Sequence, residues 1–431
     1  MRRALYPFVA LGLTLAVHEG AASSAEPIDP IATLRLALML DCSGVAQPPQ
    51  VMAAQLPGAV TAQEQPIPPK GAPIGSRWLF ALRNGGQALV DRYAKAGKLL
   101  TLLAEYDEPR QGGPRPALAA LGNEGCYLAS GRRLVYDAEG HAIAVELLDA
   151  RMAPTGQREL LDADVPPARD PGGVAVALVD TGVNYLLPEI GDRLARDASG
   201  RSLGYDYWEM DARPFDRNPV VSPFFPERHG TKTASVLLRE AAQVRLLPYR
   251  YPRPDMSRFA ALIDDAARKG TVILTISLGS DEREEWQSFA AAAARHPEML
   301  FIVSAGNDGR DLDRVPVYPA ALELANKITV TSADAATGRP APGANWGSRT
   351  VDLAVPAEGI RVTNFAGEDE RVSGSSYAAP RVAALAARLL LTHPGWHAAE
   401  LESAIYARAK PVLVDGKTVL RHGVILNPTA P

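Results

Sequence analysis

The sequence predicts an α/β protein whose larger domain is a mainly parallel sheet flanked by helices, preceded by a smaller α+β N-terminal domain. From about residue 170 onward, short apolar strands alternate with helix-like segments, the pattern of parallel sheets covered by helices. Before about residue 165 the composition differs and this alternation is absent. The chain has 431 residues, enough for two or three domains at roughly 100–200 residues each.

Composition and charge exclude several classes of function. Apolar residues make up 47% of the chain and charged residues 22%, which is ordinary for a globular protein with a core. The formal net charge is -4, so we expect no nucleic-acid partner bound through a basic face. Two cysteines are too few for a zinc-finger or iron–sulfur framework.

Residues 1–25 predict a secretory signal peptide. Met1–Arg3 is a positive start, Ala4–Val17 is mostly apolar, and Ser23–Ala25 offers small residues for cleavage. The apolar run is short for the ~30 Å of a bilayer's hydrocarbon core, and a retained anchor is the alternative. We therefore expect a secreted or periplasmic protein with no membrane association after signal removal.

Residues 26–165 are expected to form the N-terminal domain. Ile31–Leu40 is a short apolar run, and Gln47–Gly75 has the composition of a loop or linker. The spacing of apolar residues over Trp78–Tyr106 predicts a helix. Alternation over Arg133–Leu148, around a turn at Asp137–Gly140, predicts a hairpin.

Both cysteines, Cys42 and Cys126, lie in this N-terminal domain. Because exported proteins meet an oxidising environment, we expect the two to form a disulfide bond. The alternative is a pair of unlinked buried thiols.

The second domain, residues 166–431, begins at a boundary rich in proline and glycine, Pro166–Gly173. Strands and helices then alternate, as in a parallel sheet with helices on both faces. The predicted strands are Val174–Val179, Val244–Leu247, Val272–Leu278, Leu300–Ser304 and Ile328–Thr331, and the predicted helices are Thr231–Ala242, Ser257–Lys269 and Glu284–Ala294.

Polar residues stand where two of these elements end or begin, the place where active groups gather in open parallel sheets. Asp180–Gly182 follows the first strand and supplies a carboxylate that could orient a base. His229–Thr231 opens a helix, and an imidazole there can exchange a proton near neutral pH. Taken singly, the first has the ordinary explanation of a turn and the second that of a solvent-facing or capping histidine.

Two further segments complete the set. Ser304–Asn307 follows a strand, and the Asn307 amide could donate to a developing oxyanion; an ordinary turn is the alternative. Gly374–Pro380 opens a helix, which places Ser376 where the helix dipole favours negative charge, unless it is only a cap. Together the four segments hold the groups of nucleophilic acyl transfer: nucleophile, base, orienting carboxylate and oxyanion donor.

These segments, in the chain order Asp, His, Ser, resemble the motifs of the subtilisin-like serine peptidases over about residues 170–410. The resemblance implies a triad of Asp180, His229 and Ser376, with Asn307 in the oxyanion hole. It also implies that Ser277, Leu278 and Gly279 pair with extended substrate backbone. The further substrate-binding candidates are Ser304, Ala305 and Gly306.

The chain departs from the family pattern near the catalytic residues. Lys232–Ser235 stands where the family usually has His-Val-Ala-Gly, and Lys232 either lowers the pKa of His229 or points away from it. Ser375 replaces a usual Thr and Tyr377 a usual Met. Neither change removes a catalytic group, so an active enzyme is expected.

The predicted function is that of an exported serine endopeptidase that cleaves peptide or protein substrates through an acyl-enzyme on Ser376. One alternative is a subtilase-like protein that binds peptides but whose base is disabled by Lys232. Another is an α/β-hydrolase using Ser376, Asp415 and His422, which would need a strand before its nucleophile where Glu368–Arg371 is a poor candidate.

No cofactor and no catalytic metal are expected, although the resemblance leaves room for structural calcium. Asp308–Asp313 is either a loop that holds calcium or a solvated acidic loop. The N-terminal domain, residues 26–165, is either a prodomain that acts as an intramolecular inhibitor and is then removed, or a retained accessory domain. Substrate preference is not readable from the sequence.

Overall fold

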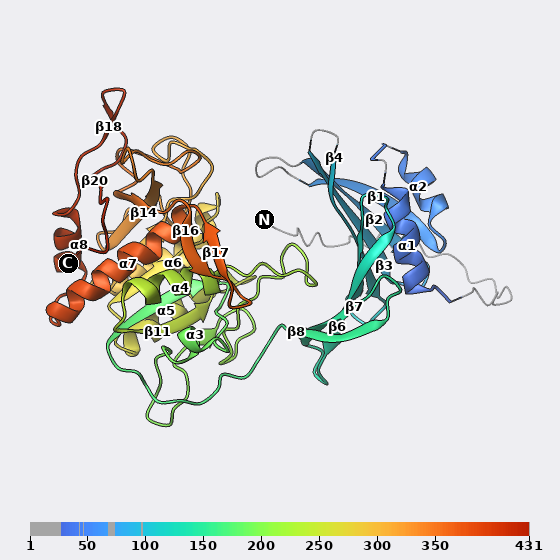
Figure 1. The fold of residues 1–431 in the computed structure, drawn as a ribbon, viewed down its shortest axis with the longest axis horizontal. Helices are drawn as coiled ribbons and strands as arrows, with labels where there is room; N and C mark the ends of the chain where they lie inside the picture. The colour runs from blue at the N-terminus through green and yellow to red at the C-terminus, as the bar shows by residue number, and fades with distance from the viewer. Residues whose placement is uncertain (1–26, 43, 46, 68–73, 96–97, 431) are drawn as a thin grey trace. The chain divides into compact units, whose positions relative to one another are not determined.

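The computed structural model describes residues 27–42, 44–45, 47–67, 74–95 and 98–430, and it divides into two compact units (Figure 1). The N-terminal unit runs to Asp162 and also includes Pro219–Pro226. The C-terminal unit comprises Ala163–Asn218 and the chain from Glu227 onward. The chain therefore passes between the units three times, after residues 162, 218 and 226. The predicted signal peptide lies outside the described residues.

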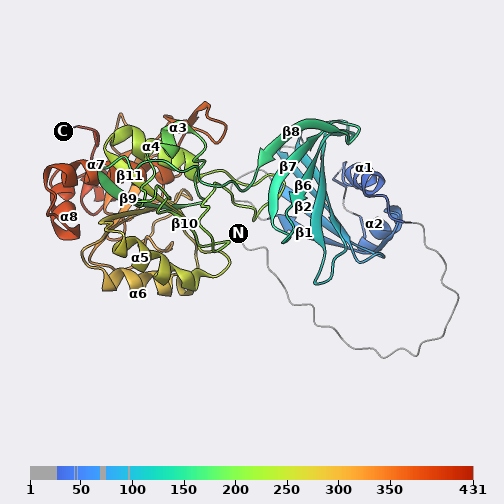
Figure 2. The same cartoon turned by 90° about the horizontal axis from the view of Figure 1, so that it is seen from below.

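The N-terminal unit is built on an eight-stranded antiparallel sheet whose strands pair in chain order. Two helices, α1 (Pro30–Leu40) and α2 (Pro49–Gln55), lie on one face of this sheet (Figure 2). The strands are β1 (Ala59–Ile67), β2 (Ile74–Leu82), β3 (Gln87–Lys95), β4 (Lys98–Glu108), β5 (Arg115–Gly122), β6 (Leu128–Tyr136), β7 (Ala142–Leu148) and β8 (Pro154–Leu160).

The helix predicted over Trp78–Tyr106 is wrong, because this segment forms β2, β3 and most of β4. Trp78 and Phe80 alternate along β2 and pack with Leu34 and Leu38 of α1 in one buried cluster. Neighbouring residues on the other face of these strands are also partly or fully buried. A strand covered on both faces carries apolar residues at many spacings, so the helical period is matched by chance.

The prediction of a loop or linker over Gln47–Gly75 is also wrong, since α2 and β1 occupy most of the described part of it. The predicted hairpin is confirmed: β6 and β7 pair antiparallel, and the Asp137 carboxylate accepts a hydrogen bond from the His141 N–H at 2.8 Å. The predicted disulfide is confirmed as well. Cys42 and Cys126 are bonded, with Cα atoms 5.6 Å apart, and join the end of α1 to the β5–β6 turn.

The C-terminal unit contains an eight-stranded sheet in which every neighbouring pair is parallel, in the order β10-β11-β9-β12-β13-β14-β15-β20. This confirms the predicted fold class. The strands are β9 (Val174–Asp180), β10 (Tyr205–Asp206), β11 (Val244–Arg250), β12 (Ile273–Ile276), β13 (Leu300–Ser304), β14 (Lys327–Ala333), β15 (Leu353–Pro356) and β20 (Gly423–Val424). Two small hairpins lie outside it: β16 (Ile360–Thr363) with β17 (Asp369–Val372), and β18 (Leu413–Val414) with β19 (Lys417–Thr418).

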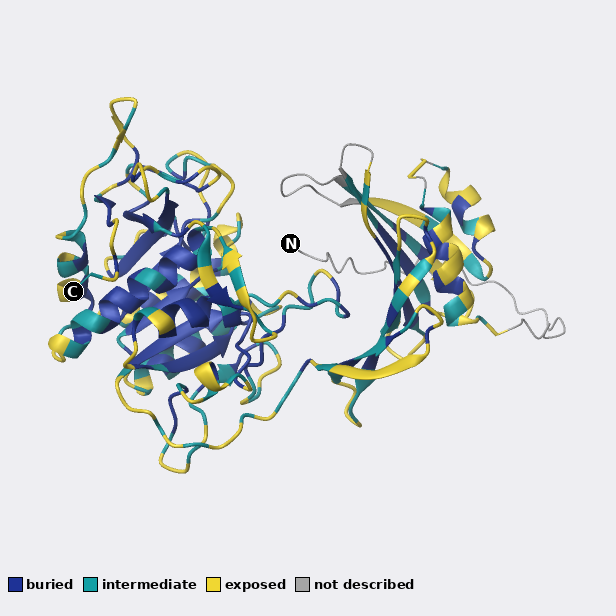
Figure 3. Ribbon diagram, in the orientation of Figure 1, coloured by how far each residue is buried: buried dark blue, intermediate teal, exposed yellow. Residues whose placement is uncertain are grey.

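Helices cover both faces of the parallel sheet. One buried cluster joins it to α4 (Gly230–Glu240), α7 (Ser375–Thr392) and α8 (Ala398–Tyr406), and a second joins it to α5 (Phe259–Arg268) and α6 (Gln287–Arg295). Figure 3 shows the sheet between them as the most buried part of the unit. The shorter elements are α3 (Pro188–Gly191) and the 3₁₀ turns η1 (Met256–Arg258) and η2 (Arg283–Trp286).

The central strand β9 explains why the sequence is readable here. Val176 and Leu178 belong to one buried cluster, whereas Ala177 and Val179 belong to the other. Successive side chains point to opposite faces, and both faces are covered, so the strand is an uninterrupted apolar run. The chain places β11 on one side of β9 and β12 on the other, and the crevice at such a switch point is where α/β sheets bind ligands.

All the strands and helices predicted for this unit are present. The sequence missed β10 and β20, which have two residues each and are too short to show a period, and it also missed the four-residue β15. Within the described part of the chain, no helix is both long enough and apolar enough to cross a membrane.

Candidate active site

The predicted site residues lie at the carboxyl edge of the parallel sheet. Asp180 is the last residue of β9, and His229 immediately precedes α4. Ser376 is the second residue of α7, and Asn307 follows β13. The structure thus gathers at one edge four residues that span almost 200 positions of sequence.

Asp180 and His229 form a direct pair. His229 Nδ1 lies 2.8 Å from Asp180 Oδ1 and 3.0 Å from Oδ2, so the ring donates its Nδ1–H to the carboxylate. The Asp180 side chain is 3% exposed and that of His229 is 19% exposed. This bond fixes the tautomer in which Nε2 carries the lone pair, the form that can accept a proton from a hydroxyl.

The remaining lone pairs of Asp180 are also occupied. The backbone N–H of Thr181 donates to Oδ1 at 2.7 Å, and the hydroxyl of Thr233 donates to Oδ2 at 3.0 Å. A carboxylate that accepts several hydrogen bonds keeps its orientation. Thr233 comes from the first turns of α4, so the helix that follows His229 also holds its partner.

Two opposing effects set the pKa of His229. Burial by itself lowers it, because the charged imidazolium is poorly solvated. The charge of Asp180 and its hydrogen bond act in the other direction and outweigh burial, so that the pKa is raised to about 9.

Lys232 does not lower this pKa. Its Nζ lies 2.9 Å from Glu370 Oε1, so its charge is paired with a carboxylate of β17. The charges that act on the His229 pKa are carboxylates, with Asp180 foremost, and they raise it.

Ser376 is the second residue of α7, whose first turn approaches the imidazole through the neighbouring residue. The ring of the next residue, Tyr377, lies 5.7 Å from the His229 ring, centroid to centroid. The hydroxyl of Ser277, which follows β12, donates to the Ser376 carbonyl at 2.9 Å. The N–H of Ser376 lies in the first turn of the helix, where no intrahelical carbonyl can accept it.

Asn307 and the Ser376 loop are locked together. Asn307 Oδ1 accepts the Ser375 N–H at 2.8 Å, which leaves the Nδ2 amide of Asn307 to donate elsewhere. Gly374 has φ of 128°, and a Cβ there would lie 3.0 Å from Asn307 Oδ1, so the close approach requires glycine. The fully buried Ser375 accepts the Gly306 N–H at 3.0 Å.

The substrate-binding candidates follow β12 and lie at and after the end of β13, whose last residue is Ser304. The Ser277 hydroxyl is engaged with the nucleophile loop, as described above. The Ala305 N–H donates to Val330 and its carbonyl accepts Asn345 Nδ2, so the Ala305 backbone is already paired within the fold. Their contact with substrate stays a prediction, as it does for the remaining candidates, Leu278, Gly279, Ser304 and Gly306.

A second buried carboxylate, Asp216, lies behind the pair and was not predicted. It is fully buried and accepts hydrogen bonds from the Thr181 hydroxyl at 2.5 Å and the Thr231 N–H at 2.9 Å. The Thr181 hydroxyl in turn accepts the N–H groups of His229 and Gly230, at 3.1 and 2.8 Å. Burial raises the pKa of Asp216. Asp216 has no neighbouring motif in the sequence, which is why only the fold identifies it.

Asn345 holds the Asn307 loop in the same way. It is fully buried, and its Oδ1 accepts the N–H groups of Asp308 and Arg310 at 3.0 and 2.9 Å. It lies 38 positions beyond Asn307 in sequence, without a recognisable pattern.

The acidic loop Asp308–Asp313 shows how its carboxylates are used. Asp313 accepts the Ser348 hydroxyl at 2.9 Å and the Thr350 N–H at 3.0 Å, and Asp308 faces the Arg310 guanidinium at 3.8 Å. Across the described ranges, no three Asp, Glu, His or Cys side chains converge as metal ligands would. Structural calcium therefore stays an untested prediction.

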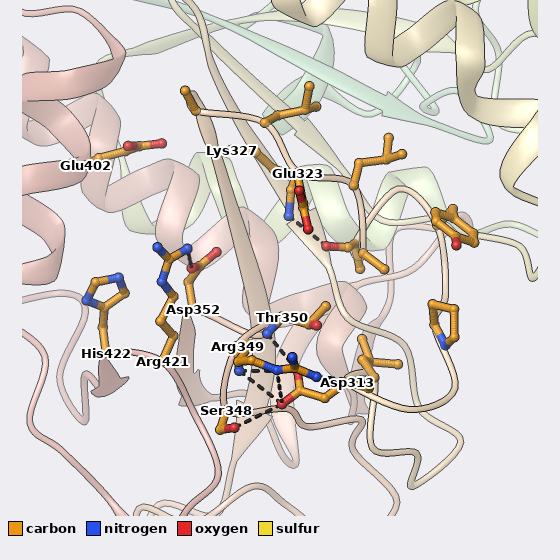
Figure 4. A pocket seen from close by; sticks show the side chains of 18 of the residues that line it. Asp313, Glu323, Lys327, Ser348, Arg349, Thr350, Asp352, Glu402, Arg421 and His422 are labelled. Carbon is orange, nitrogen blue, oxygen red and sulfur yellow. Dashed lines mark hydrogen bonds and ion pairs between the residues drawn. The ribbon is translucent and has the colours of Figure 1, made fainter.

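His422, the base that the α/β-hydrolase alternative would need, does not lie at the carboxyl edge of the sheet. A strand does precede Ser376, contrary to expectation, but this strand, β17, pairs only with β16 and not with the parallel sheet. His422 precedes β20 at the amino edge of the sheet, and its ring stacks on Tyr406. It borders a cavity of about 950 Å³ that is also lined by Lys327, Asp352, Glu402 and Arg421 (Figure 4).

Comparison with known proteins covers the C-terminal unit. The sequence model of the Subtilase family matches residues 172–423. A thermophilic serine proteinase of Bacillus sp. (strain AK1) is 29% identical over 267 residues, which cover 59% of this chain and 60% of that protein. Alkaline serine exoprotease A of Vibrio alginolyticus is 30% identical over 265 residues, covering 59% of this chain and 45% of that protein.

The chain therefore spans about half to three fifths of the length of these relatives. Among solved structures, a cold adapted subtilisin-like serine proteinase aligns with a TM-score of 0.48 and 25% identity, over 62% of this chain and 93% of that one. The region matched by the family model covers more than half of the chain and includes Asp180, His229 and Ser376. The chain belongs to the subtilase family.

Proposed function

We propose that this chain is an exported serine endopeptidase that hydrolyses peptide bonds of peptide or protein substrates through an acyl-enzyme on Ser376. The observation that carries the proposal is the buried Asp180–His229 hydrogen bond at the carboxyl edge of the sheet, beside the start of α7. With its Nδ1–H donated to a buried carboxylate, the neutral imidazole carries its lone pair on Nε2, as a general base for a serine hydroxyl requires.

The first half of the reaction forms the acyl-enzyme. The Ser376 hydroxyl oxygen attacks the scissile carbonyl carbon, and His229 Nε2 accepts the hydroxyl proton. Asp180 keeps its hydrogen bond to Nδ1 and stabilises the imidazolium. The imidazolium then gives the proton to the leaving amine nitrogen as the C–N bond breaks.

The oxyanion of the tetrahedral intermediate needs donors that are already in place. Asn307 Nδ2 and the Ser376 N–H are the two groups that the site offers. The first is oriented because Asn307 Oδ1 accepts the Ser375 N–H, and the second lies in the first turn of α7, where an α-helical carbonyl four residues earlier is missing. In the second half, water attacks the acyl ester by the same proton route, and Ser376 is regenerated.

Export is supported by residues 1–25, which have the pattern of a signal peptide, and by the disulfide of the N-terminal unit. The Lys232–Glu370 ion pair removes the reason for supposing that Lys232 disables the base. An active enzyme is thus better supported than a subtilase-like binding protein.

The test is a peptide-library digestion together with labelling by a fluorophosphonate probe, performed on the wild type and on Ser376→Ala. The wild type is expected to digest and to label, and Ser376→Ala is expected to do neither. In subtilisin, a member of this family, loss of the nucleophile lowers kcat about 10⁶-fold.

The matched control is Ser373→Ala, which removes an exposed hydroxyl three residues before the nucleophile. It should label and digest like the wild type. An unlabelled wild type, or a labelled Ser376→Ala, would contradict the proposal, and peptide binding without digestion would favour a binding protein.

A further inference from the structure

The segment Pro219–Pro226, here named the arm, belongs to the N-terminal unit although the chain on both sides of it belongs to the C-terminal unit. Its eight residues are Pro-Val-Val-Ser-Pro-Phe-Phe-Pro, without a charge. The arm is grouped with the N-terminal unit although it lies more than 50 residues further along the chain. Its last residue is three positions before His229.

The arm packs on the face of the antiparallel sheet that α1 and α2 do not cover. On β4, Leu102 and Ala104 belong to the cluster shared with the helices, whereas Leu103 belongs to a separate cluster. Alternate residues of a strand point to opposite faces, so this separate cluster marks the second face. Phe224 is fully buried in this cluster, whose other buried members are Leu103, Ala119, Leu134, Val145 and Leu161.

Polar contacts give the arm a defined position. Its Ser222 hydroxyl donates to Glu105 of β4 at 2.5 Å and accepts the Phe224 N–H at 3.2 Å. Arg132 of β6 donates to the Phe224 carbonyl at 2.9 Å and holds its guanidinium 4.3 Å above the ring of Phe225. These directional contacts fix the position and orientation of the arm on the sheet, which hydrophobic burial alone would not do.

The base of the arm is closed within the C-terminal unit. Asn218 and Glu227, the residues that flank the arm, pair through both backbone hydrogen bonds, at 3.0 and 2.9 Å. Their side chains also bond, Asn218 Nδ2 to Glu227 Oε2 at 2.8 Å. The arm is therefore a loop whose two ends are held together by the Asn218–Glu227 pair, close to His229 in the sequence.

We propose that the arm is a non-covalent lock that retains the N-terminal unit on the subtilase unit after the connecting chain has been cut. The second face of the antiparallel sheet is the binding surface, and its partner is Pro219–Pro226 of the same chain. A cut in Pro166–Gly173 then breaks the covalent connection between the two units, but Phe224 stays packed in the cluster on the second face. The working enzyme is a two-part protein, and the N-terminal unit is a retained domain. This inference does not depend on the proposed catalysis.

The test uses the full chain with Ser376→Ala, so that it does not digest itself, and a recognition sequence for a site-specific protease inserted after the exposed Pro171. After cutting, the two fragments are expected to elute together in gel filtration under non-denaturing conditions. With Phe224→Asp added, which places a charge in the buried cluster, they are expected to elute separately. Val221→Asp is the matched control, because Val221 lies in the same arm but is 47% exposed, and its fragments should stay together.

Thermal unfolding of the uncut protein shows whether Phe224→Asp still folds. If it does not, a milder variant provides the test. Arg132→Ala removes the bond to the Phe224 carbonyl and the contact with Phe225. It is expected to weaken fragment association about tenfold, the loss of a hydrogen bond from a charged group. Separation of the fragments with an unchanged arm would overturn the proposal, and so would unchanged association in a folded Phe224→Asp or in Arg132→Ala.

Discussion

The two units of this molecule bring residues together in different ways. In the N-terminal unit each strand pairs with its neighbour in sequence, so that apart from the arm the sheet joins only residues that were already close along the chain. In the C-terminal unit the parallel strands require crossovers, and their carboxyl ends meet at one edge. Asp180 and His229 are hydrogen-bonded at that edge, and the start of α7, which carries Ser376, lies next to them.

The units also differ in what stabilises them. The parallel sheet is covered by helices on both faces and contains no cysteine. The antiparallel sheet has helices on one face only, and it is closed by the Cys42–Cys126 bond and by the arm on its other face. The disulfide lies in the cluster on the helix side, whereas the arm covers apolar side chains on the second face that would otherwise be exposed.

The largest effect is expected from Asp180→Asn, which should lower kcat by about 10⁴-fold. The amide cannot hold His229 in the tautomer whose Nε2 accepts a proton. Thermal unfolding of the N-terminal unit should be unchanged, because Asp180 lies in the other unit. Steady-state kinetics on a peptide substrate measure the effect, and a loss of less than tenfold would contradict the assigned role.

Removal of the disulfide by Cys42→Ser with Cys126→Ser should affect only the N-terminal unit. The bond closes a loop with a sequence separation of 84, for which the chain-entropy model gives about 4–5 kcal/mol of unfolding free energy. Denaturant unfolding measures this loss, and fluorophosphonate labelling of Ser376 should persist. Loss of labelling would show that the two units are not independent in stability.

Asn307→Ala should lower kcat by about 10²–10³-fold with little change in KM, because the amide acts on the oxyanion and not on the bound substrate. The expected size is that of an oxyanion donor in a related subtilisin. A change confined to KM would instead place Asn307 among the substrate contacts. Asn345→Asp, which disturbs the loop without removing the donor, should give a smaller loss.

The smallest expected effect is that of pH. His229 must be neutral to accept the proton, and its pKa is raised to about 9, so kcat/KM should rise with pH and level off near that value. Between pH 7 and pH 9 the neutral fraction of His229 grows by about 50-fold. The raised pKa of His229 also adds to the free energy of unfolding, because the folded protein holds the imidazolium more tightly than the unfolded chain does. This stabilisation is complete below the unfolded pKa of about 6.5 and is lost as pH rises through about 9. Lys232→Ala should leave the inflection in place, and a large displacement would show that Lys232 acts on the imidazole.

The sequence was informative where burial is regular. Strands β9, β11, β12, β13 and β14 were predictable because a strand covered on both faces is a short apolar run bounded by turns. The same two-sided burial misled the interpretation of Trp78–Tyr106, where no flanking helices arbitrate between strand and helix. The four motifs were recognisable because nucleophile, base and oxyanion donor each need a particular side chain in a particular local geometry.

What surrounds these motifs was not predictable. Asp216 and Asn345 support the site through hydrogen bonds to loops far away in sequence, and any residue of suitable length in the right place would do the same. The pairing of Lys232 with Glu370 joins positions 138 residues apart. Local periodicity and local chemistry were enough to predict the parallel-sheet fold and the motifs of the family, because both lie within short stretches of sequence. The partners that hold the motif residues, and the place of Phe224 in the N-terminal unit, depend on distances between residues far apart along the chain, which no local pattern contains.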